Sequence, residues 1–315
     1  MKTKVYIDGS EGTTGLRIFE RMAGRDDIEL ITIDSALRKD PAARAECINA
    51  SDITFLCLPD AAAIEAVSLV ANDNVRIIDA STAHRTAEGW AYGFAELSPA
   101  HRAAIVNGKR IANPGCHATG FISLVYPLVH GGLLSADAAL SCFSLTGYSG
   151  GGKKMIAQYE QEEGRDVALD APRLYGLTQQ HKHLKEMKAI CGLSKAPLFT
   201  PIVADYYAGM LVSVPLTAEM LGGATLSKVH ECYADAYAGQ KLVKVLPLSA
   251  QADCGGFLTA NALSGRDSLE ILVTGNDERI TVCSRFDNLG KGASGAAVQS
   301  LNLMMGCDET TGLIV

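Results

Sequence analysis

Residues 4–16 of the chain, KVYIDGSEGTTGL, decide the fold. Residues 4–8 predict a short β-strand, and a helical segment begins near Leu16. The turn between them can approach a pyrophosphate closely, and the N–H groups at the helix start can hold its negative charge. The spacing therefore predicts a dinucleotide-binding loop, whose contact residues are Gly9, Ser10, Gly12, Thr13, Thr14 and Gly15. The alternative is that the glycines only let the helix pack closely on the sheet.

Strand-like and helix-like segments alternate after this loop. We expect strands at residues 28–33, 53–58 and 75–79, and helices at residues 41–48 and 61–71. Strands that alternate with helices imply a parallel sheet covered on both faces. The predicted fold class is therefore α/β, with a doubly wound, Rossmann-type parallel sheet in the first part of the chain.

The second predicted strand ends at Asp34, where such sheets contact the adenosine ribose of a dinucleotide. Asp34 suits a free 2′-hydroxyl, whereas Ser35 together with Arg38 or Lys39 suits a 2′-phosphate. An ordinary solvated loop is the alternative for each of these residues. We expect Ser35 and Arg38 to contact the cofactor, and NADPH to be preferred over NADH.

Residues 113–119, NPGCHAT, present one cysteine on a tight turn. The Asn-Pro and Pro-Gly pairs favour a turn, and the apolar run at 118–129 has the length of a buried helix. Cys116 would then lie at a helix N-terminus, where unpaired N–H groups and the helix dipole stabilise a thiolate. The prediction is a nucleophilic thiol, and the alternative is a small buried apolar side chain.

Two other segments follow predicted strands, at the edge where open α/β sheets bind their ligands. The first is LPD at 58–60, in which Pro59 is a candidate cofactor contact. The second is DASTAHR at 79–85, in which Ser81 offers a hydroxyl. Arg85 can bind a carboxylate or a phosphate through paired hydrogen bonds, although an arginine in a loop is usually just solvated.

Composition limits the classes of partner. The chain has 315 residues, 48% of them hydrophobic, which suffices for a large core and two domains. A net charge of −7 without a Lys/Arg-rich run disfavours nucleic acid. Nine cysteines without a CxxC pair fit reduced thiols. The first residues lack a signal-peptide pattern, and no apolar run reaches the ~18 residues of a membrane span. We expect a cytoplasmic protein with no membrane partner and no bound metal ion.

The organisation changes after Cys116. Strands are expected at 138–146, 210–215, 241–246, 268–274 and 279–285, with helices near 153–162 and 225–237. This pattern predicts an α+β domain built on a mixed sheet with helices on one side, and an exposed apolar sheet face would suit dimerisation. No linker or repeat separates the parts. The predicted domains are therefore 1–116, 117–287 and 288–315, the last of which contains a helix that returns to the first domain.

Several motifs together resemble the N-acetyl-γ-glutamyl-phosphate reductases, and most closely their shorter, second type. These motifs are GSEGTTG, DASTAHR, YGFAEL at 92–97, NPGCHAT and DNLGKGASG at 287–295, in the same order over nearly the whole chain. The resemblance implies reversible, NADPH-dependent reduction of N-acetyl-γ-glutamyl phosphate to the semialdehyde within arginine biosynthesis. It also implies a homodimer or homotetramer. Aspartate-semialdehyde dehydrogenases share the architecture and the thiol chemistry, so another acyl phosphate remains an alternative substrate.

Reduction of an acyl phosphate through a thioester needs a nucleophile, an acid/base, an anion site and a dinucleotide site. The segment QQHKHLKEM at 179–187 resembles the His-x-His stretch of the family. Two histidines one residue apart are expected to point in different directions. We expect His181 to be the base and His183 to bind substrate; the reverse assignment and His117 are the alternatives.

The same resemblance makes residues 149–152, SGGG, an active-site loop near cofactor and substrate, although their composition alone indicates a flexible turn. We expect Ser149 and Asn113 to contact the substrate, and Gly150 and Asn288 to contact the cofactor.

Two alternative functions, each from a different class of protein, remain. A non-catalytic dinucleotide sensor would need the glycine loop but no reactive thiol. A cysteine hydrolase could use Cys116 and a histidine, but it would leave the glycine loop unexplained.

Overall fold

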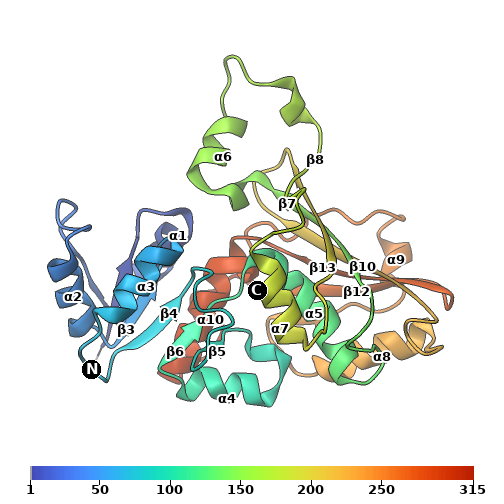
Figure 1. Cartoon of the computed structure of the whole chain (residues 1–315), viewed down its shortest axis with the longest axis horizontal. Coiled ribbons are helices and arrows are strands. Elements are labelled where there is room, and N and C mark those ends of the chain that lie inside the picture. Colours follow the sequence, from blue (N-terminus) through green and yellow to red (C-terminus); the bar gives the residue numbers. More distant parts are fainter. Residues whose placement is uncertain (1) are drawn as a thin grey trace. The chain divides into compact units, whose positions relative to one another are not determined.

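The computed structural model describes residues 2–315 (Figure 1), which cluster by their contacts into two compact units. The first unit contains the chain up to Pro114 together with Ala293–Leu313. The second unit contains Gly115–Gly292 and Ile314–Val315. The division into domains at 1–116, 117–287 and 288–315 stays a prediction.

The first unit is built on a six-stranded, entirely parallel sheet in the order β2-β1-β3-β4-β6-β5. Its strands are β1 (Thr3–Asp8), β2 (Ile28–Ile31), β3 (Ile53–Leu56), β4 (Arg76–Asp79), β5 (Ala91–Tyr92) and β6 (Arg110–Ala112). Its α-helices are α1 (Thr13–Met22), α2 (Pro41–Ala50), α3 (Asp60–Ser68), α4 (Pro99–Asn107) and α10 (Gly295–Met305). Because β2 and β3 lie on opposite sides of β1, the chain reverses direction across the sheet there.

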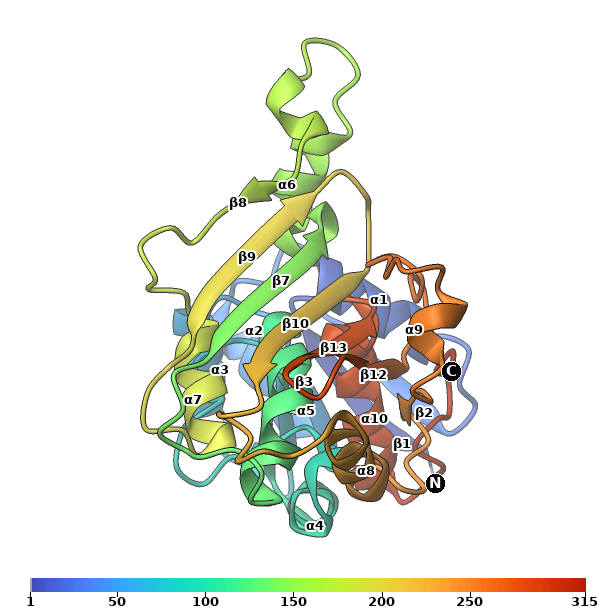
Figure 2. The ribbon, with the colours of Figure 1, turned by 90° about the vertical axis from the view of Figure 1, so that its right-hand side faces the viewer.

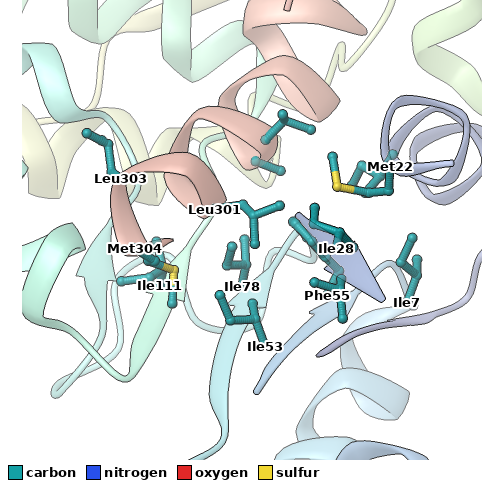
Figure 3. Close-up of a cluster of buried hydrophobic side chains, with 14 of the residues drawn as sticks. Ile7, Met22, Ile28, Ile53, Phe55, Ile78, Ile111, Leu301, Leu303 and Met304 are labelled. Carbon is teal, nitrogen blue, oxygen red and sulfur yellow. The ribbon is translucent and has the colours of Figure 1, made fainter. Parts of the chain in front are cut away.

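Alternate residues of the buried strands supply two cores, one on each face of this sheet. Val5 and Ile7 of β1 face the core that α1, α4 and α10 cover, whereas Tyr6 faces the core under α2 and α3. Figure 3 shows Leu301 of α10 within the first of these cores. Helices cover both faces, so the prediction of a doubly wound parallel sheet is confirmed.

The second unit is built on a seven-stranded mixed sheet in the order β11-β12-β13-β10-β7-β9-β8. Its strands are β7 (Ser141–Gly147), β8 (Arg173–Leu174), β9 (Leu198–Ala204), β10 (Met210–Thr217), β11 (Val243–Val245), β12 (Leu269–Gly275) and β13 (Arg279–Phe286). Its α-helices are α5 (Cys116–His130), α6 (Gly152–Tyr159), α7 (His183–Cys191), α8 (Leu226–Ala236) and α9 (Ala250–Asp253). The pairs β7–β9 and β11–β12 are parallel and the others antiparallel, which confirms the predicted mixed sheet.

Helix α5 packs on strands β10 and β13 of this sheet, with α7 and α8 beside it (Figure 2). Gly120 makes the close approach possible: a Cβ there would lie 2.3 Å from Val212 Cγ2. The hydroxyls of Tyr233 and Tyr237 donate to carbonyls of α5 at 2.7 Å. A buried helix is thus held on several sides, which determines the position of its first residue.

Strand β9 and helix α4 are two of the longer elements that the sequence-based expectation missed. Strand β9 contains Pro201, which has no N–H to donate and weakens the strand pattern. Helix α4 is short and carries only one fully buried side chain, Ile105. Neither segment shows the periodicity on which such predictions depend.

A buried ion pair joins two helices to the first strand of the parallel sheet. The Arg44 guanidinium lies 2.9 Å from Asp8 Oδ2 and 2.7 Å from Glu65 Oε2. Asp8 and Arg44 are both buried. Burial raises the pKa of Asp8, and the hydrogen bond from Arg44 opposes that rise.

We expect Arg44→Ala to lower the free energy of unfolding of the first unit by about 3–5 kcal/mol, because it leaves Asp8 buried without its counter-charge. Urea unfolding followed by the fluorescence of Trp90, the single tryptophan, reports on this unit. The matched control is Lys109→Ala in the same unit, since the Lys109 ammonium donates to the Asp73 carbonyl at 2.8 Å at an exposed position. Equal unfolding midpoints for the two variants would contradict the expectation.

Candidate active site

Cys116 is the first residue of α5, at the helix start that the sequence predicts. Gly115 is the N-cap, and its N–H donates to Glu186 Oε1 of α7 at 2.8 Å. Gly292 packs against the cysteine, since a Cβ on Gly292 would lie 3.0 Å from Cys116 Cβ. The thiol is only partly buried, so it combines access for a substrate with the positive end of a helix dipole.

Other cysteines differ from Cys116 in their surroundings. Burial raises the pKa of the Cys57 thiol to about 12, and it also raises the pKa values of Cys142 and Cys191. These thiols stay protonated near neutral pH and are poor nucleophiles.

Three histidine rings gather beside the start of α5. The centroid of His117 lies 5.7 Å from that of His181 and 5.4 Å from that of His183. Phe199 of β9 packs against His117 and His181 at 5.2 and 5.1 Å. The segment that precedes α7 and the helix that begins at Cys116 therefore share one cluster of side chains.

The expectation that His181 and His183 point in different directions is wrong. Their rings are stacked, with centroids 4.9 Å apart and planes 29° apart. The reason is local: His183 is the first residue of α7 and His181 lies in the turn before it, so the alternation of a strand does not apply. His183 is buried and His181 is half-buried.

His117 has both ring nitrogens in hydrogen bonds. Nδ1 lies 2.6 Å from Ser144 Oγ, and Nε2 lies 2.5 Å from the Tyr175 hydroxyl. Burial lowers the pKa of His117 to about 3, with smaller contributions from His181 and Lys182. Burial also lowers the pKa of His181, and the charge of Lys182 adds to this effect. Both imidazoles are therefore neutral at pH 7, the form in which a histidine can accept a proton.

The loop after β4 is organised by the buried carboxylate of Asp79. Ser81 donates to it from both its N–H, at 2.8 Å, and its hydroxyl, at 2.7 Å. His84 Nδ1 lies 2.6 Å from Asp79 Oδ2, and its ring stacks on Trp90. Arg85 Nε donates to the Asn113 carbonyl at 3.0 Å. The predicted anion residues, Ser81 and Arg85, thus lie in one loop, and Arg85 contacts Asn113.

Asn113 is almost completely buried. Its Nδ2 donates to the Ala293 carbonyl at 3.0 Å, while its Oδ1 accepts no hydrogen bond from any residue in the described range 2–315. A buried acceptor of this kind is costly unless a ligand or a water donates to it.

The predicted residues of the glycine-rich active-site loop are brought together in the second unit. Asn288 Nδ2 donates to Ser149 Oγ at 3.0 Å, and Asn288 Oδ1 accepts from the Gly209 N–H at 2.8 Å. The Asn288 side chain therefore supports the segment that contains Ser149 and Gly150. Asp287 in turn accepts from the N–H groups of Gly265, Leu289 and Gly290.

The glycine loop after β1 forms a pocket of about 170 Å³. The pocket is lined by Gly12, Thr13, Thr14, Gly15, Cys57, Leu58 and Ala80. Two glycines are required sterically: Gly9 has φ +88°, and a Cβ on Gly15 would lie 2.3 Å from the Gly9 carbonyl oxygen. The pocket lies against the N-terminus of α1 and has the backbone donors that a pyrophosphate needs. Pro59 is the N-cap of α3 at the adjacent strand end.

Arg38, which is predicted to contact the 2′-phosphate, is paired with an acidic side chain in the structure. Arg38 forms an ion pair with Glu11, a residue of the glycine loop, and both side chains are exposed. Asp34 Oδ1 accepts from the Ala36 N–H at 2.8 Å, so Asp34 shapes the turn that contains Ser35.

Tyr175, Ser144 and Glu186 belong to this site but were not singled out in the sequence. No motif surrounds Tyr175 or Ser144, and they join His117 across 58 and 27 residues. The sequence position of Glu186 could have indicated its place in the site. It follows His183 by three residues and so lies on the same face of the helix.

Within residues 2–315, no group of three or more histidine, cysteine or acidic side chains is arranged to hold a metal ion. In the same range, no helix combines the length and the apolar character that crossing a membrane requires.

Comparison with known proteins places these features in one family. Residues 4–105 match the model for the NAD-binding domain of semialdehyde dehydrogenases, and residues 116–288 match the model for their dimerisation domain. Among curated proteins, N-acetyl-gamma-glutamyl-phosphate reductase 2 of Nostoc sp. is 46% identical, with 99% of each chain covered. The reductase of Rhizobium meliloti is 48% identical, with 97% of this chain and 99% of that one covered.

Solved structures agree on the fold. An aspartate-semialdehyde dehydrogenase of Francisella tularensis superposes with a TM-score of 0.73, covering 96% of this chain and all of that one. The enzyme of Candida albicans, solved with NADP, gives 0.65, covering 97% and 99%. Both are 15% identical in sequence, a level that supports a shared fold only. With both family models matched in order, and relatives at 46–48% identity along nearly its whole length, this chain belongs to the semialdehyde dehydrogenase family, in the branch of the N-acetyl-γ-glutamyl-phosphate reductases.

Proposed function

We propose that this chain is an NADPH-dependent oxidoreductase that reduces N-acetyl-γ-glutamyl phosphate to N-acetylglutamate semialdehyde, reversibly, in arginine biosynthesis. The names of its relatives support the substrate. The observation that carries the mechanism is Cys116 as the first residue of α5, with the neutral imidazoles of His117 and His181 beside this helix start.

Cys116 is the nucleophile of this reaction. His181 takes the thiol proton, the sulfur attacks the acyl carbon, and the bond from that carbon to the phosphate oxygen breaks. The product is a thioester on Cys116 and free phosphate. After reduction, the oxygen of the thiohemiacetal takes a proton from His181. As the C–S bond breaks, this proton passes back through His181 to the departing sulfur. The aldehyde leaves and the thiol is restored.

The glycine loop binds the cofactor, which we take to be NADPH or NADP⁺. The loop N–H groups at the start of α1 bind its pyrophosphate, and Ser35 and Arg38 contact its 2′-phosphate. Gly9, Ser10, Pro59, Gly150 and Asn288 are the further contacts. When bound, the reduced nicotinamide supplies the hydride that reduces the thioester.

Polar side chains bind the substrate. Arg85 and Ser81 bind an anionic group, since both are fixed in the Asp79 loop. Asn113 Oδ1 accepts from a donor of the substrate, which gives this buried oxygen a partner. His183 and Ser149 complete the contacts.

The protein assembles as a homodimer or a homotetramer in the cytoplasm. Phe143 of β7 and Leu198 of β9 are 44% and 67% exposed, and Leu174 of the adjoining β8 is 57% exposed. Ser144 and Phe199 face His117 and the helices, so Phe143 and Leu198 occupy the opposite face of the sheet. This apolar face supports an interface between copies. The nine cysteines form no disulfide within residues 2–315, which suits a reducing compartment.

One assay separates this function from its alternatives. Phosphate-dependent reduction of NADP⁺ by N-acetylglutamate semialdehyde is expected, with much lower activity on aspartate semialdehyde. Cys116→Ala should abolish turnover while NADPH binding persists, because hydride transfer then has no thioester to act on and the glycine loop is unchanged. Cys254→Ala, at a partly buried cysteine outside the site, should keep its activity.

Activity on aspartate semialdehyde alone would overturn the substrate. Turnover by Cys116→Ala would overturn the thioester. NADPH binding without turnover by the unaltered protein would instead favour a dinucleotide sensor.

The histidine pair has distinct expected kinetics. His181→Ala should lower kcat by about 10²–10⁴-fold with KM near its original value, the range typical of a general base. His183→Ala should mainly raise KM. The reverse pattern would exchange the two roles, and full activity in both variants would remove the pair from the mechanism.

Cofactor preference depends on the Arg38–Glu11 pair. Arg38→Ala should weaken NADPH binding by about 1.5–3 kcal/mol through the lost charge-assisted hydrogen bond, with little effect on NADH. Glu11→Gln should strengthen NADPH binding, because the carboxylate competes with the 2′-phosphate for the guanidinium. Titration of protein fluorescence with each cofactor measures both effects. Parallel changes for NADPH and NADH in either variant would refute this assignment.

A further inference from the structure

A row of three hydrogen-bonded side chains leads to the start of α5. Ser144 Oγ lies 2.6 Å from His117 Nδ1, and His117 Nε2 lies 2.5 Å from the Tyr175 hydroxyl. Ser144 and His117 are buried, and His117 is the residue that follows Cys116. The mechanism above uses none of the three side chains.

The protonation of His117 limits how this row can be arranged. Burial lowers its pKa to about 3, so the ring is neutral and has one N–H donor and one acceptor nitrogen. In one arrangement, the Ser144 hydroxyl donates to Nδ1 and the Nε2 N–H donates to the tyrosine oxygen. The hydrogen of Tyr175 is then available to another acceptor. In the other arrangement, Tyr175 donates to Nε2 and has no hydrogen left for a third group.

Tyr175 is held in place and stays protonated. Its backbone N–H donates to the Pro201 carbonyl of β9 at 3.1 Å, which ties the segment after β8 to the sheet. Burial raises the pKa of its hydroxyl, and negative charge on Cys116 raises it further. The phenol is therefore neutral, and its hydroxyl lies 2.5 Å from the ring of His117, the residue that follows Cys116 at the start of α5.

We propose that Tyr175 is a catalytic residue whose hydroxyl donates a hydrogen bond to the thiolate of Cys116. Ser144 and His117 are positioning residues, which direct the hydroxyl proton of Tyr175 toward the sulfur. The inference rests on the proposed function only in taking Cys116 as the nucleophile. A hydrogen bond to the charged form of a group favours that form, so Tyr175 lowers the pKa of the thiol. It works together with the N–H groups at the start of α5.

Other charged and titratable groups around this helix start act differently. His181 and His183 stack beside His117, and Lys182 adds positive charge that lowers the pKa of both His117 and His181. Glu186 accepts a hydrogen bond from the Gly115 N–H. Lys291, the residue before Gly292, is buried. Tyr175→Phe removes one hydroxyl and keeps the ring that packs against His181, with centroids 5.9 Å apart, so these groups are present in the variant as well.

The test is the pH profile of Cys116 alkylation by iodoacetamide in the full chain, without substrate or cofactor, read by peptide mass spectrometry. Tyr175→Phe keeps the ring and should raise the pKa of Cys116 by about one to two units, as expected for loss of a hydrogen bond to a charged group. Ser144→Ala should shift it in the same direction by less, because the proton of Tyr175 is then no longer directed. Tyr126→Phe is the control, since Tyr126 lies about 15 Å from Cys116 along α5.

An unchanged or lowered pKa in Tyr175→Phe would overturn the proposal, since it would mean that Tyr175 donates to His117 instead. An unchanged profile in Ser144→Ala would overturn the positioning role. Because alkylation needs no turnover, these outcomes are independent of the reductase assay. A shifted profile in a protein without reductase activity would reject the proposed function and leave this inference standing.

Discussion

The hydrogen bond between the Gly115 N–H and the carboxylate of Glu186 joins two helix starts. One of these helices begins with the nucleophile candidate Cys116 and the other with His183. Glu186 is buried, so its carboxylate has few alternative partners and the distance between α5 and α7 is closely determined. His181 lies two residues before the start of α7, so the tie between the two helices also holds the segment that contains His181 beside the start of α5.

Burial has a second role here besides holding the helices. It keeps His117 and His181 neutral and the phenol of Tyr175 protonated. The same effect keeps Cys57 protonated in the glycine pocket. One physical cause thus sets the protonation states of His117, His181 and Tyr175 in the second unit, and in the first unit it makes the Cys57 thiol a poor nucleophile.

Two loops of the first unit are determined by different kinds of contact. Its glycine loop is sterically determined, since side chains at Gly9 and Gly15 would collide with carbonyl oxygens. The loop after β4 is instead determined by polar contacts, because Asp79 accepts three hydrogen bonds from Ser81 and His84. Both loops lie at the carboxyl ends of parallel strands, so the sheet brings them to one edge.

The sequence by itself determined the alternation of strands and helices in the first unit, the glycine loop and the helix that begins at Cys116. Each of these depends on residues that are close in the chain, so periodicity and turn chemistry reveal it. The tertiary structure decided the rest. Only folding brings Tyr175 and Ser144 to His117, pairs Arg38 with Glu11, and stacks His181 on His183 where alternation had indicated divergence. These contacts join segments far apart in the chain or depend on where a helix starts, and no local pattern specifies either.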